Sequence, residues 1–132
     1  MLVRFFDRED EASPFNGASL HDAAKLRELF DGLRSRKPFF CELLGENGYK
    51  LLVGLGGEIG AVQHSRIDGD PPYLMAVAAS AEPTTDHTEY LIGGTATEVP
   101  ARYCLPIETV VQIALHFQKT GDRSEVVAWE GI

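Results

Sequence analysis

Two segments of the chain repeat apolar residues at the three- and four-residue spacing of an amphipathic helix. The first is predicted to begin at Ser19 and to end near Ser35, because Ser19 followed by Asp22 is close to a capping box and Pro38 disfavours helix in the residue before it. Its apolar face is formed by Leu20, Ala23, Leu26, Leu29, Phe30 and Leu33.

The second helical segment is the clearest element in the sequence. Pro106 suits the first helical position, and Gly121 suits the residue after the last turn. Leu115 falls off the apolar face and is expected to be exposed. The face itself consists of Ile107, Val110, Ile113, Ala114 and Phe117.

Short apolar or alternating runs, separated by turn residues, predict the strands. Asn47-Gly48 is a strong hairpin signal, and Gly56-Gly57 and Gly93-Gly94 mark two more turns. We expect polar loops over 7–17, 67–73 and 80–88. The predicted strands are 2–6, 39–44, 49–55, 59–64, 74–79, 90–92, 95–99 and 125–129. The sum is an α+β fold in one domain, residues 1–132, with a mostly antiparallel meander and two amphipathic helices.

The charge balance narrows the classes of partner. The 132 residues hold 12 Lys and Arg against 20 Asp and Glu, which gives a net charge of −8. The first 50 residues are nearly balanced, and there is no Lys or Arg between Ile67 and Ala101. Because nucleic-acid backbones and anionic membranes attract basic proteins, neither is expected as a partner. The acidic stretch either solvates the surface or forms an anionic face for a cationic partner.

The cysteine content and the N-terminus favour the cytoplasm. Cys41 and Cys104 do not make a disulfide framework, and Cys41 lies in an apolar run where a thiol usually packs. Both are expected to be reduced. No signal peptide and no membrane span are expected, since the acids that follow the first four residues interrupt any apolar run.

One glycine-rich run resembles a cofactor motif only at first sight. In the run 54–60 the third glycine is one residue late for a dinucleotide fingerprint, and the residues that follow predict a strand rather than a helix. A turn is therefore the better interpretation.

The histidines and cysteines give no catalytic set. His64 with Asp68 and Asp70 could approach a metal only if the loop folded back, and no histidine pair has metal-ligand spacing. Neither cysteine has a cationic neighbourhood beyond Arg102 near Cys104. We therefore predict no catalytic residue, no metal and no cofactor.

The C-terminal part of the chain resembles a known family. Its residues are Leu105-Pro106-Ile107-Glu108, Val110, Ala114, Phe117, Thr120-Gly121 and Val127-Ala128-Trp129. With the hairpin 49–57 they are similar to the signature of the first-numbered Imm family of immunity proteins from bacterial polymorphic toxin systems. The resemblance covers roughly residues 38–130, and Ser124 stands where the pattern has proline.

The resemblance implies an antitoxin of interbacterial competition. It implies a cytosolic, non-enzymatic protein that binds a cognate toxin, commonly a nucleic-acid deaminase, and blocks its active site or substrate groove. The expected state is a monomer that forms a heterodimer with the toxin. Phe117 and Trp129 are expected to hold the fold. A small metal- or His/Asp-dependent enzyme and an interaction subunit of an unrelated assembly are the alternatives.

The acidic stretch supplies the candidate contact residues. A toxin that binds nucleic acid carries a basic groove, which acidic side chains on loops can occupy. The candidates are Asp68, Asp70, Glu82, Asp86 and Glu89.

Overall fold

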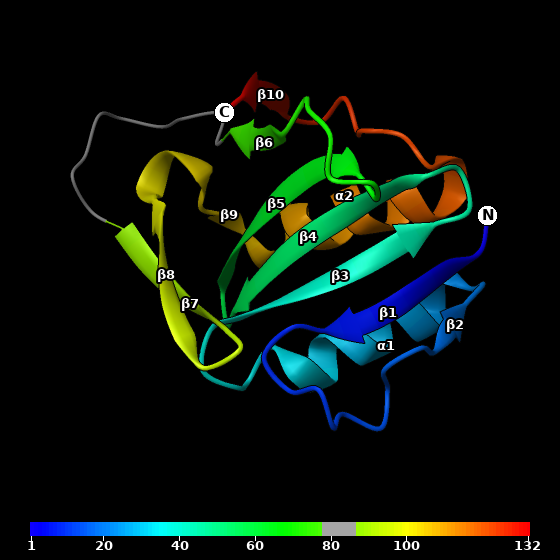
Figure 1. Ribbon diagram of the computed structural model, residues 1–132, viewed down its shortest axis with the longest axis horizontal. Helices are drawn as coiled ribbons and strands as arrows, with labels where there is room; N and C mark the ends of the chain where they lie inside the picture. Colours follow the sequence, from blue (N-terminus) through cyan, green and yellow to red (C-terminus); the bar gives the residue numbers. More distant parts are fainter. Residues whose placement is uncertain (78–86) are drawn as a thin grey trace.

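The computed structural model describes residues 1–77 and 87–132 of the chain. Within those residues two α-helices and ten strands form one domain around a single open sheet (Figure 1). The predicted α+β class with a mostly antiparallel sheet is confirmed.

The sheet is built on a central meander. Its order is β10-β6-β5-β4-β3-β1-β2, with β9 paired to β5 and the β7–β8 hairpin attached to β3. The junction of β3 and β7 is parallel, while the other pairings are antiparallel. The strands are β1 (Val3–Asp7), β2 (Ser19–Leu20), β3 (Phe39–Gly45), β4 (Tyr49–Gly56), β5 (Ile59–Arg66), β6 (Leu74–Val77), β7 (His87–Ile92), β8 (Thr95–Pro100), β9 (Leu105–Pro106) and β10 (Ala128–Gly131).

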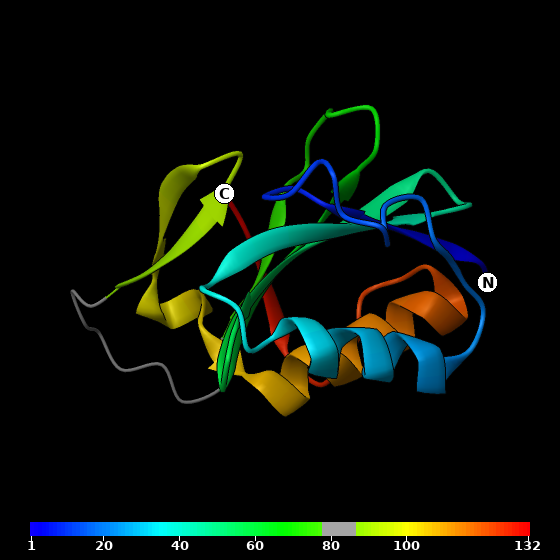
Figure 2. The same cartoon turned by 90° about the horizontal axis from the view of Figure 1, so that it is seen from below.

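Both helices, α1 (Ala23–Leu33) and α2 (Ile107–Thr120), lie against the same face of the sheet (Figure 2). The side chains between them and the sheet form the main core, because alternate residues of β3, β4 and β5 point toward the helices. The largest fully buried members are Phe5, Phe30, Phe39, Phe117, Leu26, Leu43, Leu51, Leu55, Leu105 and Ile113.

The first helix begins later than predicted. Asp22 caps it by accepting hydrogen bonds from the backbone N–H groups of Ala24 and Lys25 at 2.8 and 3.2 Å. Ser19 lies instead in β2, which pairs with β1 through Leu20 and Val3. The prediction of a helix start at Ser19 was wrong because this long-range pairing competes with the local capping pattern.

The second helix follows its prediction closely. Pro106 precedes it rather than occupying its first position, and Gly121 ends it in the left-handed conformation with φ +76°. Leu115, expected to be exposed, is half-buried and packs against the core. The last strand is β10 rather than residues 125–129, so Glu125 and Val126 lie in a turn.

The β7–β8 hairpin folds onto the face of the sheet that the helices leave open (Figures 1 and 2). Its Tyr90 is fully buried, with its ring centroid 5.2 Å from that of Phe40. A Cβ on Gly54 of β4 would lie 2.7 Å from the Tyr90 ring. The run 54–60, which ends β4 and opens β5, is therefore strand and turn as predicted, and Gly54 leaves the room in which Tyr90 lies.

The predicted strand 74–79 begins at Leu74 as β6, and its residues 78 and 79 lie outside the described residues. His87 and Thr88, expected in a loop, belong to β7, and the rest of the expected loop 80–88 lies outside the described residues.

No helix in the described part of the chain has the length and apolar character needed to cross a membrane.

Candidate functional site

The helices leave one face of the sheet, the open face, uncovered (Figure 2). It carries the side chains that alternate with the core residues of each strand. On β4 these are Lys50 and Leu52, which are both half-buried. They alternate with Leu51 and Val53, which are fully buried on the core face. The cross-strand neighbours of Leu52 are Glu42 of β3 and Gln63 of β5.

The hairpin that walls one side of this face is held at several points. The backbone N–H of Leu91 donates to the Pro38 carbonyl at 2.8 Å. At the hairpin tip, Gly93 N–H donates to the Arg8 carbonyl at 2.8 Å and Gly94 N–H donates to Glu9 Oε2 at 3.0 Å. These hydrogen bonds fix the hairpin relative to the sheet. The space between the hairpin and the sheet therefore exists before any partner binds.

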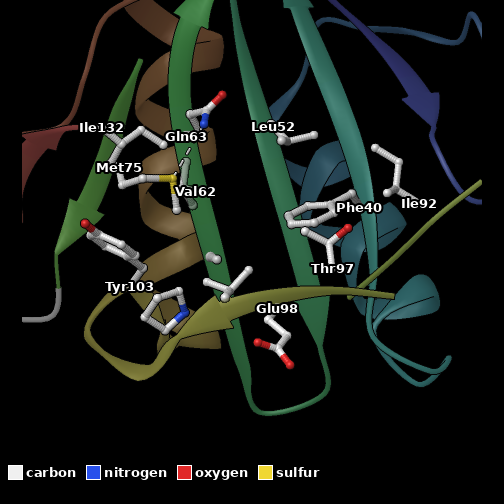
Figure 3. Close-up of a pocket in the computed structure, with 13 residues that line it drawn as sticks. Phe40, Leu52, Val62, Gln63, Met75, Ile92, Thr97, Glu98, Tyr103 and Ile132 are labelled. Carbon is white, nitrogen blue, oxygen red and sulfur yellow. Dashed lines mark hydrogen bonds between the residues drawn. The ribbon is translucent and has the colours of Figure 1, made fainter. Parts of the chain in front are cut away.

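An apolar groove lies between the hairpin and the open face (Figure 3). It encloses about 270 Å³. Met75, Tyr103 and Ile132 stand along one side, and Phe40, Leu52 and Ile92 along the other (Figure 3). Its polar side chains are few, and they are Gln63, Thr97 and Glu98.

A group of charged side chains lies beside the groove on the open face. Glu42 is 7% exposed, and its carboxylate lies 2.6 Å from Arg8 Nε and 3.2 Å from Lys50 Nζ. Burying a carboxylate costs free energy unless basic partners compensate its charge. Arg8 and Lys50 therefore stabilise the buried Glu42 carboxylate, and they are not free to bind an anion.

The described candidate acids differ in role. The Asp68 carboxylate accepts a hydrogen bond from the backbone N–H of Asp70 at 2.9 Å and forms an ion pair with Arg66. The hydrogen bond from Asp70 is the main cause that lowers the pKa of Asp68, and Arg66 adds to it. Asp68 thus shapes the loop 67–73, while Asp70 is exposed within it.

Two further acids face each other across the hairpin. Glu89 of β7 is directly opposite Glu98 of β8, and both side chains are exposed. The pair adds negative charge to the exposed side of the hairpin. Glu89 is a candidate contact residue from the sequence, whereas Glu98 is not, because its cross-strand position follows only from the hairpin register. Glu82 and Asp86 lie outside the described residues.

His64 is a core residue on the helix side of the sheet. It is 5% exposed, with its ring stacked on Tyr49 at 5.0 Å and edge-on to Phe117 at 5.8 Å and Trp129 at 6.3 Å. Burial is the main cause that lowers the pKa of His64, and the Gly121 carbonyl opposes it. Among residues 1–77 and 87–132, no group of three His, Cys, Asp or Glu side chains could hold a metal ion.

The two cysteines are free thiols with different surroundings. Cys41 is fully buried, and burial raises the pKa of its thiol, which keeps it protonated. Cys104 is half-buried, with its Sγ 3.6 Å from the Pro100 carbonyl oxygen. Burial therefore does not prepare Cys41 as a thiolate nucleophile.

The two signature aromatics also belong to the core. Phe117 is fully buried in α2. Trp129 in β10 is half-buried, packs against the core, and donates from Nε1 to the Ser124 carbonyl at 2.8 Å. Ser124, at the position where the pattern has proline, is 4% exposed and forms this turn.

Comparison with models of protein families gives a match. The family model described as Immunity protein Imm1 matches residues 16–131, which is most of the chain. The comparison with curated proteins returned no match.

Proposed function

The chain belongs to the Imm1 family of immunity proteins, and from this premise we propose that it neutralises a nucleic-acid-targeting toxin, a deaminase, by stoichiometric occlusion of the active site or substrate groove. An immunity protein acts on a cognate toxin, so the partner is a protein. In this proposal the free protein is a cytoplasmic monomer, and the inhibited form is a heterodimer.

The observation that carries the proposal is the set of acids presented beside the open face of the sheet. Asp70 on the loop 67–73 and Glu89 with Glu98 on the hairpin are exposed, and they come from the stretch without Lys or Arg. A protein that binds nucleic acid must present a positive groove to phosphates. Acidic side chains on a rigid scaffold match such a groove in charge and steer the encounter.

The candidate contact residues in this proposal are Asp68, Asp70, Glu82, Asp86 and Glu89. Asp68, Asp70 and Glu89 are all exposed. Asp70 and Glu89 suit direct contact, whereas Asp68 pairs with Arg66 and positions the loop that carries Asp70. An interface of standard size takes about 800 Å² from each partner. The protein exposes 6980 Å², so such an interface uses roughly a ninth of its surface. The groove, the hairpin and the loop 67–73 together can supply that area.

Co-expression with a toxin domain encoded by a neighbouring gene tests the proposal. The expected result is co-purification at a one-to-one ratio, with toxin activity falling linearly until equivalence. Release of active toxin after incubation, or inhibition at a small fraction of equivalence, would show turnover and contradict occlusion.

Charge reversal tests the acidic contact. The variant Asp70→Lys/Glu89→Lys leaves the Asp68 loop bonds in place, and we expect its association rate at low salt to fall by about tenfold or more. The matched control is Glu28→Lys/Glu125→Lys, which makes the same charge change at exposed acids of α1 and of the 121–127 segment. Equal association rates for the two double variants at low salt would contradict a role for these acids.

A further inference from the structure

We infer that Glu9 is a positioning residue for toxin binding, because its carboxylate holds the tip of the β7–β8 hairpin. The inference rests on the proposed function, in which the hairpin presents Glu89 to the toxin. Glu9 lies in the loop after β1 and is half-buried. It acts on toxin binding through the hairpin and not by direct contact.

The tip of the hairpin is held by hydrogen bonds rather than by packing. Its turn consists of Gly93 and Gly94, which have φ values of +56° and +81°. A Cβ at either glycine would meet no atom of the described residues within 4 Å. Glycine also loses more conformational freedom on ordering than any other residue. A tip of this kind therefore depends on contacts from elsewhere for a fixed position.

Two consecutive residues of the loop after β1 supply those contacts, and Figure 1 shows this loop beside the tip. The Arg8 carbonyl accepts the Gly93 N–H at 2.8 Å, and Glu9 Oε2 accepts the Gly94 N–H at 3.0 Å. Hydrogen bonds to an ionised acceptor are stronger than those between neutral groups. Only the Glu9 acceptor belongs to a side chain, so a substitution can remove it and leave the backbone unchanged.

Glu9 is itself fixed by the buried carboxylate of Asp7. Asp7 is 2% exposed, and its Oδ1 accepts the backbone N–H groups of Glu9 and Asp10 at 2.9 and 2.8 Å. Its Oδ2 lies 2.6 Å from Arg36 Nη1. Because these bonds exist in the free protein, the Glu9 backbone needs no further ordering to hold Gly94.

A second attachment keeps the hairpin on the sheet when the tip bond is lost. Phe39 of β3 pairs with Leu91 of β7, and the Leu91 N–H donates to the Pro38 carbonyl at 2.8 Å. The Arg36 guanidinium lies 3.8 Å from the centre of the Phe39 ring. A substitution of Glu9 should therefore loosen the tip without unfolding the protein.

The position of the tip matters because the strand that leads into it carries a candidate contact. Glu89 is exposed on β7. If the tip moves, Glu89 occupies several positions, and the toxin must restrict this motion when it binds. We expect the cost mainly in the dissociation rate, where most effects of interface substitutions are found.

Three single variants separate positioning from charge. Glu9→Ala removes both the acceptor and the charge, whereas Glu9→Gln removes the charge and keeps an amide oxygen as acceptor. The matched control is Glu11→Ala, which removes an exposed acid of the same loop. Within the described part of the chain, the Glu11 side chain has no hydrogen-bond or ion-pair partner.

Dissociation from the toxin domain that co-purifies with the chain is the first measurement. We expect Glu9→Ala to dissociate about fivefold to tenfold faster than Glu11→Ala. Glu9→Gln should stay within about twofold of Glu11→Ala, because it restores the acceptor without the charge. Equal rates for Glu9→Ala and Glu11→Ala would overturn the inference. Equally fast dissociation of Glu9→Ala and Glu9→Gln would show that the charge itself contacts the toxin, which also contradicts positioning.

Amide exchange in the free protein tests positioning without the toxin. The Gly94 N–H should exchange about tenfold faster in Glu9→Ala than in wild type, while the Val53 amide in β4 keeps its wild-type rate. An unchanged Gly94 rate would overturn the inference while the one-to-one complex still supports the proposed function. Failure of the wild-type protein to bind the toxin would refute the proposed function, and with it the role of Glu9 in binding.

Discussion

The two faces of the sheet differ in how completely they bury their side chains, and strand β4 shows the difference within a few residues. Leu51, Val53 and Leu55 point toward the helices and are fully buried. Leu52, between them, points to the open face and is half-buried at the wall of the groove. The covered face thus provides most of the buried core of the domain, and the open face leaves part of its apolar surface exposed.

The open face is nevertheless held together by specific packing. Tyr90 occupies the place that a side chain at position 54 would fill, and Phe40 packs against it. This small second cluster, with Ala61, Met75 and Val99, fixes the hairpin. Loss of the hairpin would remove the groove while leaving the main core intact.

The largest expected effect comes from the covered face. Phe117→Ala should lower the free energy of unfolding by about 3–5 kcal/mol, because it truncates a fully buried aromatic side chain in α2. Urea unfolding at 25 °C measures the change. The folded fraction of the variant should bind toxin with wild-type affinity, and a selective loss of binding with unchanged stability would reverse the assignment of the two faces.

A substitution under the hairpin should have a smaller effect on stability and a larger one on binding. Gly54→Ala places a Cβ against the Tyr90 ring, and we expect a loss of about 1–3 kcal/mol together with weaker toxin binding. The matched control is Gly32→Ala in α1, where the added Cβ meets open space, and it should raise stability by about 0.5–1 kcal/mol. If both glycine variants had the same melting temperature, the packing of Tyr90 against Gly54 would be irrelevant.

Trp129→Phe tests the role of an aromatic side chain in β10, at the edge of the sheet. The change removes the hydrogen bond from Nε1 to the Ser124 carbonyl and keeps an aromatic ring against His64. We expect a loss of about 1 kcal/mol with toxin protection retained. Abolished protection with unchanged melting temperature would show that Trp129 contacts the toxin.

The covered face should also confer a pH dependence through His64. Burial lowers the pKa of His64 below that of the unfolded chain, so the unfolded chain takes up the proton more readily. Stability should therefore fall as the pH decreases below about 6.5, the ordinary value, and it should not change from this cause above it. Arg123 and Asp122 lie near enough to act on this group, with opposite signs.

Urea midpoints between pH 5 and 7.5 for wild type and His64→Phe measure this effect. The difference between the two proteins should shift in favour of the variant as the pH decreases. A difference that stays constant across this range would refute the assignment to His64.

The sequence predicted the elements well where the signals are local. The Asn47-Gly48 turn, the Gly121 helix stop and the apolar face of α2 all follow from short patterns and are confirmed. The predicted start of α1 was wrong because β2 pairs with β1. The residues near Ser19 alone give no signal of this long-range pairing. The family resemblance extends further toward the N-terminus than its motif suggested, since the family model begins at residue 16.

The groove could not be predicted because it exists only after the hairpin lies on the sheet. Its walls come from β3, β4, β5, β6, β7 and β8 together with Tyr103 and Ile132. Leu52 and Met75 appeared in the sequence as ordinary strand residues. The candidate acids Asp68, Asp70 and Glu89 were visible as a stretch without bases, but only the register shows Glu89 opposite Glu98.

Hydrogen–deuterium exchange on the one-to-one toxin complex tests most directly whether the open face is the binding face. We predict slower exchange over β7, β8 and the loop 67–73 when toxin is bound, with exchange in α1 and in the exposed side of α2 unchanged. Protection confined to α1 and α2, with the hairpin and the loop exchanging as in the free protein, would contradict the account.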